Sequence, residues 1–191
     1  MNIVGLLLAA GSATRFGSDK LAHRLPHGVP IAVQAARHLH AVVPGIYAVV
    51  KPGADELARL LAPHCQTIVC ENAAEGMGAS LACAARAAGR ADGYLVALAD
   101  MPFVRTASIA AVRDALAAGA PLAAPYWRAR RGHPVGISGI FFEQLVGLGG
   151  DEGAKGLLRE NEKQLVKIPV GDPGILRDID TPGDLAPPLN V

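Results

Sequence analysis

The segment from Leu8 to Lys20 combines small residues with two cations. It reads Leu8-Ala9-Ala10-Gly11-Ser12-Ala13-Thr14-Arg15-Phe16-Gly17-Ser18-Asp19-Lys20 and ends an apolar run that begins at Ile3. Small residues at the carboxyl end of a first strand let a ligand approach the backbone, whose amides bind anionic oxygens. Arg15 and Lys20 add positive charge suited to a polyphosphate. The segment therefore predicts phosphate binding, with a connecting loop that carries two solvated cations as the alternative.

Two familiar phosphate-binding loops do not fit this segment. A Walker A loop has four residues between its glycines and then Gly-Lys-Ser/Thr. Here five residues separate Gly11 from Gly17, and Lys20 comes three residues later. The dinucleotide fingerprint G-x-G-x-x-G is also missing. If the loop binds phosphate, it therefore does so in a way that differs from both of these types.

An acidic residue follows an apolar run in the middle of the chain. The run over 94–99 leads into Asp100-Met101-Pro102. Pro102 keeps Met101 out of the helical region, so the chain leaves the sheet there. Asp100 is then expected at the carboxyl end of a strand, where ligands collect in open α/β sheets. Mg²⁺ binds one or two carboxylates together with phosphate oxygens, so Asp100 is a candidate Mg²⁺ ligand. The alternative is a helix cap, a role for which Thr106 is better placed.

A second acidic segment lies near the carboxyl end of the chain. Asp178 and Asp180 are two residues apart, so on an extended strand both point to one face. They are either metal ligands or solvated loop carboxylates. Thr181, Pro182 and Asp184 have the pattern of a helix start, with an N-cap, a proline at the first position and a carboxylate at the third. Thr181 and Asp184 are therefore expected to have structural roles.

Two further segments place polar residues beside glycines. Gly76 and Gly78 precede a predicted helix, where they permit a tight turn with free N–H groups. Ser80 then either binds a ligand or folds back on its own helix. Around Arg131 and His133 lies the densest basic stretch of the chain. It is either an acceptor-phosphate site or a solvated β-turn with a structural histidine.

The elements that must position these residues follow from alternating apolar and Ala-rich stretches. Strands are predicted over 3–8, 46–50, 67–70 and 94–99, and helices over 30–42, 54–61, 78–88 and 106–118. This alternation is typical of βαβ units with a parallel sheet buried on both faces. Further strands are predicted over 122–126, 135–138 and 165–170, with a short helix over 153–160. We therefore expect an α/β fold with a wound parallel half followed by a mixed half.

Length and composition restrict the kind of protein. The chain has 191 residues, 51% of them hydrophobic, which suits one domain over residues 1–191. Its net charge of +1 and pI near 7.8 argue against nucleic-acid binding. Three cysteines (65, 70 and 83) form no C-x-x-C pair, which favours a reducing compartment. The apolar start lacks a basic leader and is too short to span a membrane. We therefore expect a cytoplasmic protein without membrane attachment.

Several of these motifs together resemble one enzyme family. The pattern L-A-A-G-x-x-x-R-F-G-x-x-K resembles the signature loop of the nucleotidyltransferases that mature the molybdenum cofactor. A-D-M-P and D-I-D-T-P-G-D-L resemble two acidic elements of that family. N-x-x-x-G-M-x-x-S-L and R-x-G-H-P-V resemble its base-side and pterin-side elements. A G-D-x-G-A segment carries Lys155 where the family usually has arginine, which loses bidentate phosphate geometry. The resemblance runs from Leu8 to Leu185.

The resemblance implies a fold and a set of roles. The fold would be a three-layer α/β/α Rossmann-like (glycosyltransferase-A-like) nucleotidyltransferase fold with a mostly parallel sheet. Arg15, Lys20 and Asp100 would be catalytic. Asp100 would bind the metal together with Asp180, which is preferred over Asp178. Arg131 and His133 would contact the acceptor. The nucleotide would be bound by Leu8, Ala9, Ala10, Gly11, Arg15, Lys20, Gly76, Ser80 and Asp100.

The resemblance also implies a reaction. With Mg²⁺, CMP would pass from CTP to the phosphate of the molybdenum-cofactor pterin (molybdopterin), and pyrophosphate would leave. The Leu-Ala-Ala-Gly form resembles the cytidylyl branch, whereas Leu-Ala-Gly-Gly resembles the guanylyl branch, so CTP is favoured over GTP. A client molybdoenzyme would be a further partner. Alternatives are a nucleotidyltransferase for sugar or alditol phosphates and a non-catalytic carrier of the cofactor.

Overall fold

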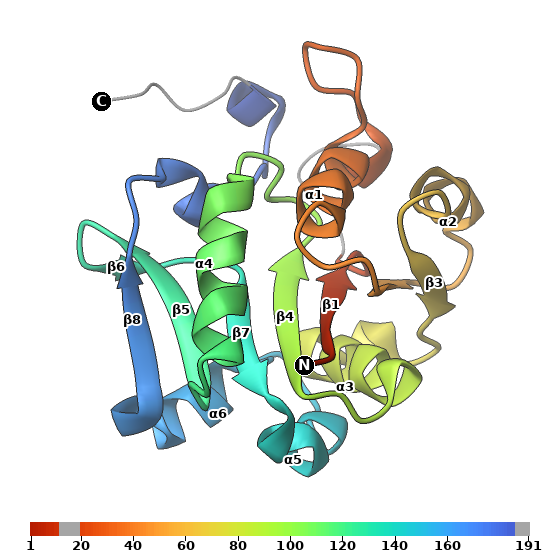
Figure 1. Ribbon diagram of the computed structural model, residues 1–191. Helices are drawn as coiled ribbons and strands as arrows, with labels where there is room; N and C mark the ends of the chain where they lie inside the picture. The colour runs from red at the N-terminus through yellow and green to blue at the C-terminus, as the bar shows by residue number, and fades with distance from the viewer. Residues whose placement is uncertain (12–19, 186–191) are drawn as a thin grey trace.

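The computed structural model describes residues 1–11 and 20–185, and Figure 1 shows their arrangement. The strands are β1 (Ile3–Leu8), β2 (Ile46–Val50), β3 (Gln66–Val69), β4 (Gly93–Leu98), β5 (Leu122–Trp127), β6 (Arg130–Arg131), β7 (Val135–Ser138) and β8 (Leu165–Pro169). The α-helices are α1 (Ile31–His40), α2 (Asp55–Leu61), α3 (Met77–Ala88), α4 (Thr106–Ala117), α5 (Phe142–Val146) and α6 (Lys155–Glu160). Short 3-10 helices include η1 (Lys20–Ala22), η2 (Ala73–Glu75), η3 (Gly139–Phe141), η4 (Glu162–Gln164), η5 (Pro173–Leu176) and η6 (Pro182–Leu185).

The strands form one mixed sheet with the order β3-β2-β1-β4-β7-β5-β6, and β8 pairs with β5. The first four strands in this order are parallel, and β1 lies between β2 and β4. β7 is antiparallel to both β4 and β5, whereas β8 is parallel to β5. The expected parallel half followed by a mixed half is confirmed. The carboxyl ends of the parallel strands therefore meet at one edge of the sheet.

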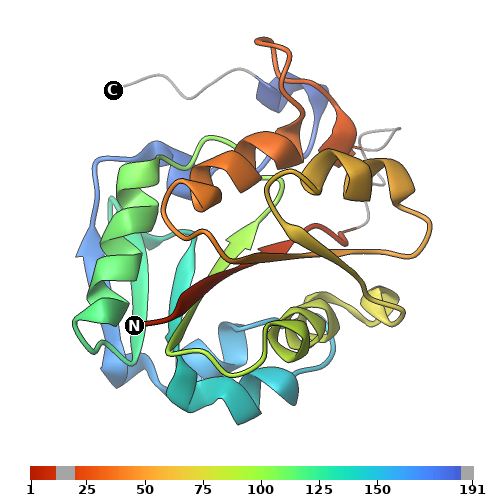
Figure 2. The same cartoon turned by 45° about the vertical axis from the view of Figure 1, so that its right-hand side comes forward.

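Helices cover both faces of the sheet, as Figure 2 shows. One hydrophobic cluster joins the sheet to α1, α2 and α4, and it includes Ile31, Leu57 and Leu116. A second cluster joins the other face to α3, α5 and α6, and it includes Leu81 and Leu145. The strands are apolar on both faces because both faces are covered. This is the expected three-layer α/β/α architecture.

Most predicted elements lie where the sequence indicates, but the start of α4 differs. Thr106 is its first helical residue, and Arg105 occupies the N-cap position without a side-chain cap. Asp172, which is distant in sequence, supplies the missing acceptor. Its Oδ2 accepts hydrogen bonds from the Arg105 amide at 2.9 Å and from Ser108 Oγ at 2.7 Å. The prediction that Thr106 caps α4 was wrong because a tertiary contact replaces the local one.

Residues 171–185, called here the C-terminal strap, cross the carboxyl edge of the sheet. Besides Asp172, the Ile175 carbonyl anchors the strap by accepting from the His133 amide at 2.9 Å. The Ile179 amide donates to the Asp100 carbonyl, also at 2.9 Å. Near its end, Asp184 Oδ2 accepts from the Thr181 amide at 2.8 Å and closes η6, so the expected helix start is a 3-10 turn. The strap thereby brings its acidic residues beside Asp100.

No helix in the described parts of the chain is long and apolar enough to cross a membrane.

Candidate functional site

Three charged residues from distant parts of the sequence meet at the carboxyl edge of β1 and β4. Lys20 Nζ donates to Asp100 Oδ2 at 3.0 Å and to Asp180 Oδ1 at 3.3 Å. Lys20 opens η1 and is only 9% exposed, whereas Asp180 lies exposed on the strap. A buried ammonium must be paired, since an unpaired buried charge is very costly. The two carboxylates supply that pairing.

The carboxylates also form a group that suits a divalent cation. Asp100, Asp178 and Asp180 each offer one oxygen, and these oxygens all lie within 4.8 Å of one another. Hard carboxylate oxygens are the ligands that Mg²⁺ and related cations prefer. The expected convergence of the two acidic segments is thus present, and both aspartates of the strap take part in it. The residues present fit a divalent metal.

Lys20 stays protonated over the physiological range. Burial alone would lower its pKa, but the charges and hydrogen bonds of Asp100 and Asp180 outweigh burial and raise the pKa above the ordinary 10.5. The contribution of the lysine's protonation to stability is therefore fully present just below pH 10.5 and is lost as the pH rises through the raised pKa. Lys20 is a permanent positive charge at this edge.

Next to this group lies a cavity of about 690 Å³, called here the charged cavity. Its size is that of sites for small molecules and cofactors. It takes residues from the carboxyl ends of all four parallel strands. Among the described residues it is lined by Leu8, Ala10, Gly11, Lys20, Leu21, Lys51, Pro52, Glu71, Ala73, Ala74, Gly76, Met77, Ser80, Leu98, Asp100, Asp151 and Asp180.

The candidate residues of the entry loop have different positions relative to this cavity. Leu8, Ala10 and Gly11 line it. Ala9 is only 2% exposed, and its side chain is in the hydrophobic cluster under α1. The difference arises because successive side chains of an extended chain point to opposite faces. Arg15 lies outside the described residues.

The start of α3 forms the opposite wall, and Gly76 is essential to its shape. Gly76 has φ +123° and ψ −172°, a conformation essentially restricted to glycine. A Cβ there would also collide with Asp151 Oδ1 and lie 2.6 Å from the Gly150 carbonyl oxygen. Ser80 is buried and donates to the Gly76 carbonyl at 3.3 Å while lining the cavity. Of the two roles open to Ser80, the fold-back bond is therefore present.

Three charged residues of the cavity were not among the expected site residues, although Asp151 stands in the G-D-x-G-A segment. Lys51 directly follows β2, and Glu71 lies just beyond β3. Both positions could have been found by the rule that ligands collect at the carboxyl ends of parallel strands. Asp151 belongs to the loop before α6. This loop packs on the start of α3, where the Gly78 amide donates to the Gly150 carbonyl at 2.7 Å. That long-range contact has no local signal in the sequence.

Neither Arg131 nor His133 of the basic stretch is among the described residues that line the charged cavity. Arg131 is exposed on β6. His133 is partly buried and lines a small interior cavity of about 10 Å³ together with Leu98 and Met101. Its Nδ1 is buried and has no hydrogen-bond partner among the described residues.

The ring of His133 is neutral at pH 7. Burial lowers its pKa to about 4. The charges of Arg131 and Lys155 lower this pKa further, and Asp178 opposes them. Three charged groups from separate segments therefore act electrostatically on one ring.

Comparisons with known proteins agree with this geometry. Residues 5–165 match the model of the MobA-like NTP transferase domain. The chain is 30% identical to the purine catabolism protein PucB of Bacillus subtilis over 94% of this chain and 92% of that protein. The crystal structure of Rv0371c from Mycobacterium tuberculosis H37Rv superposes with a TM-score of 0.83 at 25% identity, over 96% of this chain and 94% of the other.

A nucleotidyl transferase from Methanothermobacter superposes with a TM-score of 0.79 at 22% identity, over 96% of this chain and 94% of that one, which shows a shared fold. The family match covers residues from all four parallel strands that build the charged cavity, and it includes both Lys20 and Asp100. This chain belongs to the family of MobA-like NTP transferase domains.

Proposed function

We propose that this protein transfers a nucleotidyl group, CMP from CTP, to the phosphate of a molybdenum-cofactor pterin with the help of Mg²⁺. The observation that carries the proposal is the meeting of Lys20, Asp100 and Asp180 at the mouth of the charged cavity. A carrier that only holds a cofactor has no need of a buried lysine between two carboxylates. The resemblance of the acidic and base-side motifs to the molybdenum-cofactor enzymes supports the choice of acceptor.

The nucleotide would lie across the carboxyl ends of the parallel strands. Its base and ribose would contact the start of α3 near Gly76 and Ser80, and its phosphates would lie near Gly11 and Lys20. A glycine-containing loop favours phosphate oxygens, whereas the expected free amides of Gly76 and Gly78 already donate to the Ala73 and Gly150 carbonyls. Arg15 is proposed as a second phosphate-binding cation. The Leu8-Ala9-Ala10-Gly11 sequence favours cytosine over guanine by its resemblance to the cytidylyl branch.

Asp100 and Asp180, with Asp178 beside them, would hold the metal. When bound, the Mg²⁺ would neutralise charge on the α-phosphate and on the departing pyrophosphate. Lys20 stays charged because its pKa is raised, so it stabilises negative charge throughout the reaction. Transfer of this kind depends on positioning and charge neutralisation. A general base is not needed, because the acceptor phosphate is already ionised at pH 7.

The acceptor would approach from the side of Arg131. Arg131 and Lys155 both act electrostatically on His133, as does Asp178. We propose that the acceptor's phosphate binds near these two cations and lies next to the metal ligands. Lys155 offers a point charge there in place of the family's bidentate arginine. His133 is proposed to hold the acceptor-binding segment in place, since its ring is partly buried and neutral.

The test is to incubate the purified protein with Mg²⁺, a phosphorylated pterin acceptor and each NTP, and to measure pyrophosphate release. We expect CTP to be used at least tenfold better than GTP, and we expect no release without Mg²⁺. In a thermal-shift assay, CTP at a hundredfold excess over Kd adds about 2.7 kcal/mol of stability. A preference for GTP would overturn the cytidylyl assignment alone. Absence of binding by any NTP would overturn the transferase.

A further inference from the structure

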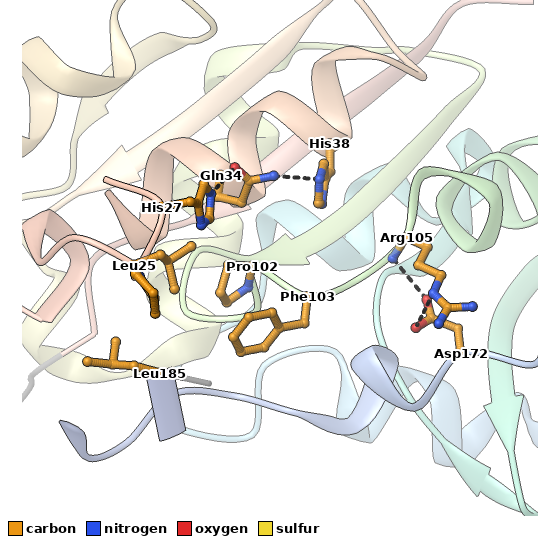
Figure 3. Close-up of a pocket in the computed structure, with 10 residues that line it drawn as sticks. Leu25, His27, Gln34, His38, Pro102, Phe103, Arg105, Asp172 and Leu185 are labelled. Atoms are coloured by element: carbon orange, nitrogen blue, oxygen red, sulfur yellow. Dashed lines mark hydrogen bonds and ion pairs between the residues drawn. The ribbon is translucent and has the colours of Figure 1, made fainter. Parts of the chain in front are cut away.

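A second cavity of about 500 Å³, called here the apolar cavity, lies beside α1, as Figure 3 shows. None of the residues that line it is among those that line the charged cavity. Within the described part of the chain they are Leu25, Pro26, His27, Gln34, His38, Pro102, Phe103, Arg105, Asp172 and Leu185. Its volume is large enough for a bicyclic ring system with a substituent.

Its walls continue the segments that carry the charged residues of the reaction site. Leu25 follows Lys20 in the chain, Pro102 follows Asp100, and Leu185 follows Asp180. In Figure 3, Leu25 and Leu185 lie at one end of the cavity, and Pro102 and Phe103 lie below Gln34 of α1. These walls are apolar and include two rings. Ring faces of a ligand pack well against such groups.

The polar side of the apolar cavity is a hydrogen-bonded row on one helix and the loop before it. Gln34 Nε2 lies 2.6 Å from His38 Nε2, and Gln34 Oε1 lies 3.3 Å from His27 Nε2. An amide has two N–H donors and an oxygen with two lone pairs. When His38 accepts and His27 donates, one N–H and one lone pair of Gln34 remain. Glutamine uses such a pair to bind two adjacent groups on the edge of a heterocyclic ring.

The charges around the cavity are already compensated. Arg105 Nε lies 3.8 Å from Asp172 Oδ1, and Asp172 is buried. Burial lowers the pKa of His38, so its ring is neutral at pH 7. An anionic ligand would meet the Asp172 carboxylate as well as the guanidinium. The cavity therefore suits a neutral ligand with apolar faces and a hydrogen-bonding edge.

We propose that the apolar cavity binds a neutral, planar heterocycle whose edge carries an amide-like donor and acceptor pair, held by Gln34 and packed against Pro102 and Phe103. Two sources supply this chemistry: the ring of the acceptor substrate, or a free heterocycle that acts as an effector. That the cavity binds such a ring does not depend on the proposed function. That the ring is part of the acceptor substrate rests on that function. In either case the ligand contacts the segments that position Lys20, Asp100 and Asp180.

The experiment titrates the full chain with pterin and with hypoxanthine, in the presence of saturating CTP and Mg²⁺, and follows binding by calorimetry. Both probes carry the amide-like edge, whereas benzoate is flat and anionic and serves as the negative probe. We expect pterin or hypoxanthine to bind with a Kd below about 1 mM. Gln34→Leu keeps the size of the side chain but removes the amide, so it should weaken binding about tenfold or more. Phe103→Leu should weaken it by a smaller factor.

Gln144→Leu is the matched control, because Gln144 is an exposed glutamine on α5. It should bind both probes like the unchanged protein. The proposal is overturned if neither probe binds, or if Gln34→Leu and Gln144→Leu bind them equally. It is also overturned if benzoate binds as tightly as pterin.

Competition separates the two sources. If the cavity holds the acceptor's ring, the phosphorylated pterin displaces free pterin, and Gln34→Leu raises the acceptor KM about tenfold with little change in the CTP KM. If the cavity serves an effector, free pterin changes the transfer rate without competing with the acceptor. NTP binding is measured on its own, so loss of NTP binding with ring binding intact would refute only the proposed function. The reverse result would refute only this inference.

Discussion

The charged cavity and the apolar cavity lie on consecutive stretches of the same three segments, yet their chemistry is opposite. One carries Lys20, Asp100 and Asp180, and the other carries Leu25, Pro102 and Leu185. Carboxyl ends of parallel strands expose backbone and small side chains, which suits an anionic ligand. Beyond that edge, the chain packs against α1 and must bury apolar groups. A few residues of chain therefore separate a site for charge from a site for a neutral ring.

The contrast between the charged cavity and the apolar cavity is tested most strongly by the substitution Asp100→Asn. If Asp100 binds the metal, this change removes a negative ligand without altering size, and we expect kcat to fall about 10³-fold, or ~4 kcal/mol. Pyrophosphate release measured over a range of Mg²⁺ concentrations gives the result. Asp114→Asn on the surface of α4 is the matched control and should leave kcat unchanged. Equal activity of both variants would exclude Asp100 from the reaction.

Gly76→Ala tests the wall of the charged cavity. The new Cβ would be strained at φ +123° and would collide with the 150–151 loop, so we expect a loss of about 3 kcal/mol or more in the free energy of unfolding. Gly119→Ala is the control, because Gly119 also has a positive φ, +95°, but has open space around it. That variant should lose only about 1 kcal/mol. Urea unfolding of both measures the difference, and similar losses would mean that the contact with the loop is unimportant.

The pH dependence of stability tests the interior between the cavities. The folded state holds the pKa of His133 at about 4, below the ordinary 6.5, so the unfolded chain binds more protons between these values. Stability should be complete above pH 6.5 and fall by up to ~3 kcal/mol as the pH drops to 4. His133→Gln should flatten this part of the curve, whereas His40→Gln on the exposed end of α1 should not. Unfolding followed by circular dichroism at several pH values measures both, and parallel curves for the two variants would contradict this role of His133.

The smallest expected effect is on NTP binding and concerns Lys51, which lines the charged cavity but not the apolar cavity. Lys51→Ala removes one exposed cation from a cavity proposed to hold a triphosphate, so the NTP KM should rise about three- to tenfold. The effect should shrink at high salt, because exposed charges are screened. Lys163→Ala in η4 is the control and should not change KM. Pterin binding to the apolar cavity should be unaffected by Lys51→Ala, which sharpens the distinction between the two cavities.

The sequence by itself determined the parallel half of the sheet and the charged residues at its edge. Short apolar runs such as Ile3–Leu8 and Ile46–Val50, which alternate with Ala-rich helices, indicate strands buried on both faces of a parallel sheet. The end of β4 then places Asp100 at the carboxyl edge, whereas Lys20 lies in η1 beyond the entry loop, so its pairing with Asp100 is a contact between distant segments.

Only the tertiary structure decided the rest, because it depends on contacts between segments distant in sequence. Asp172 caps α4 in place of Thr106, and the loop at Asp151 closes the charged cavity against α3. The apolar cavity arises where α1, the loop after Asp100 and the C-terminal strap meet. Pro102 and Leu185 stand in the two acidic motifs, but nothing in those motifs indicates a cavity, since apolar side chains that line a cavity have the same pattern as those that fill a core. The position of a void is fixed by how packed elements fit together, and that fit is absent from any single stretch of sequence.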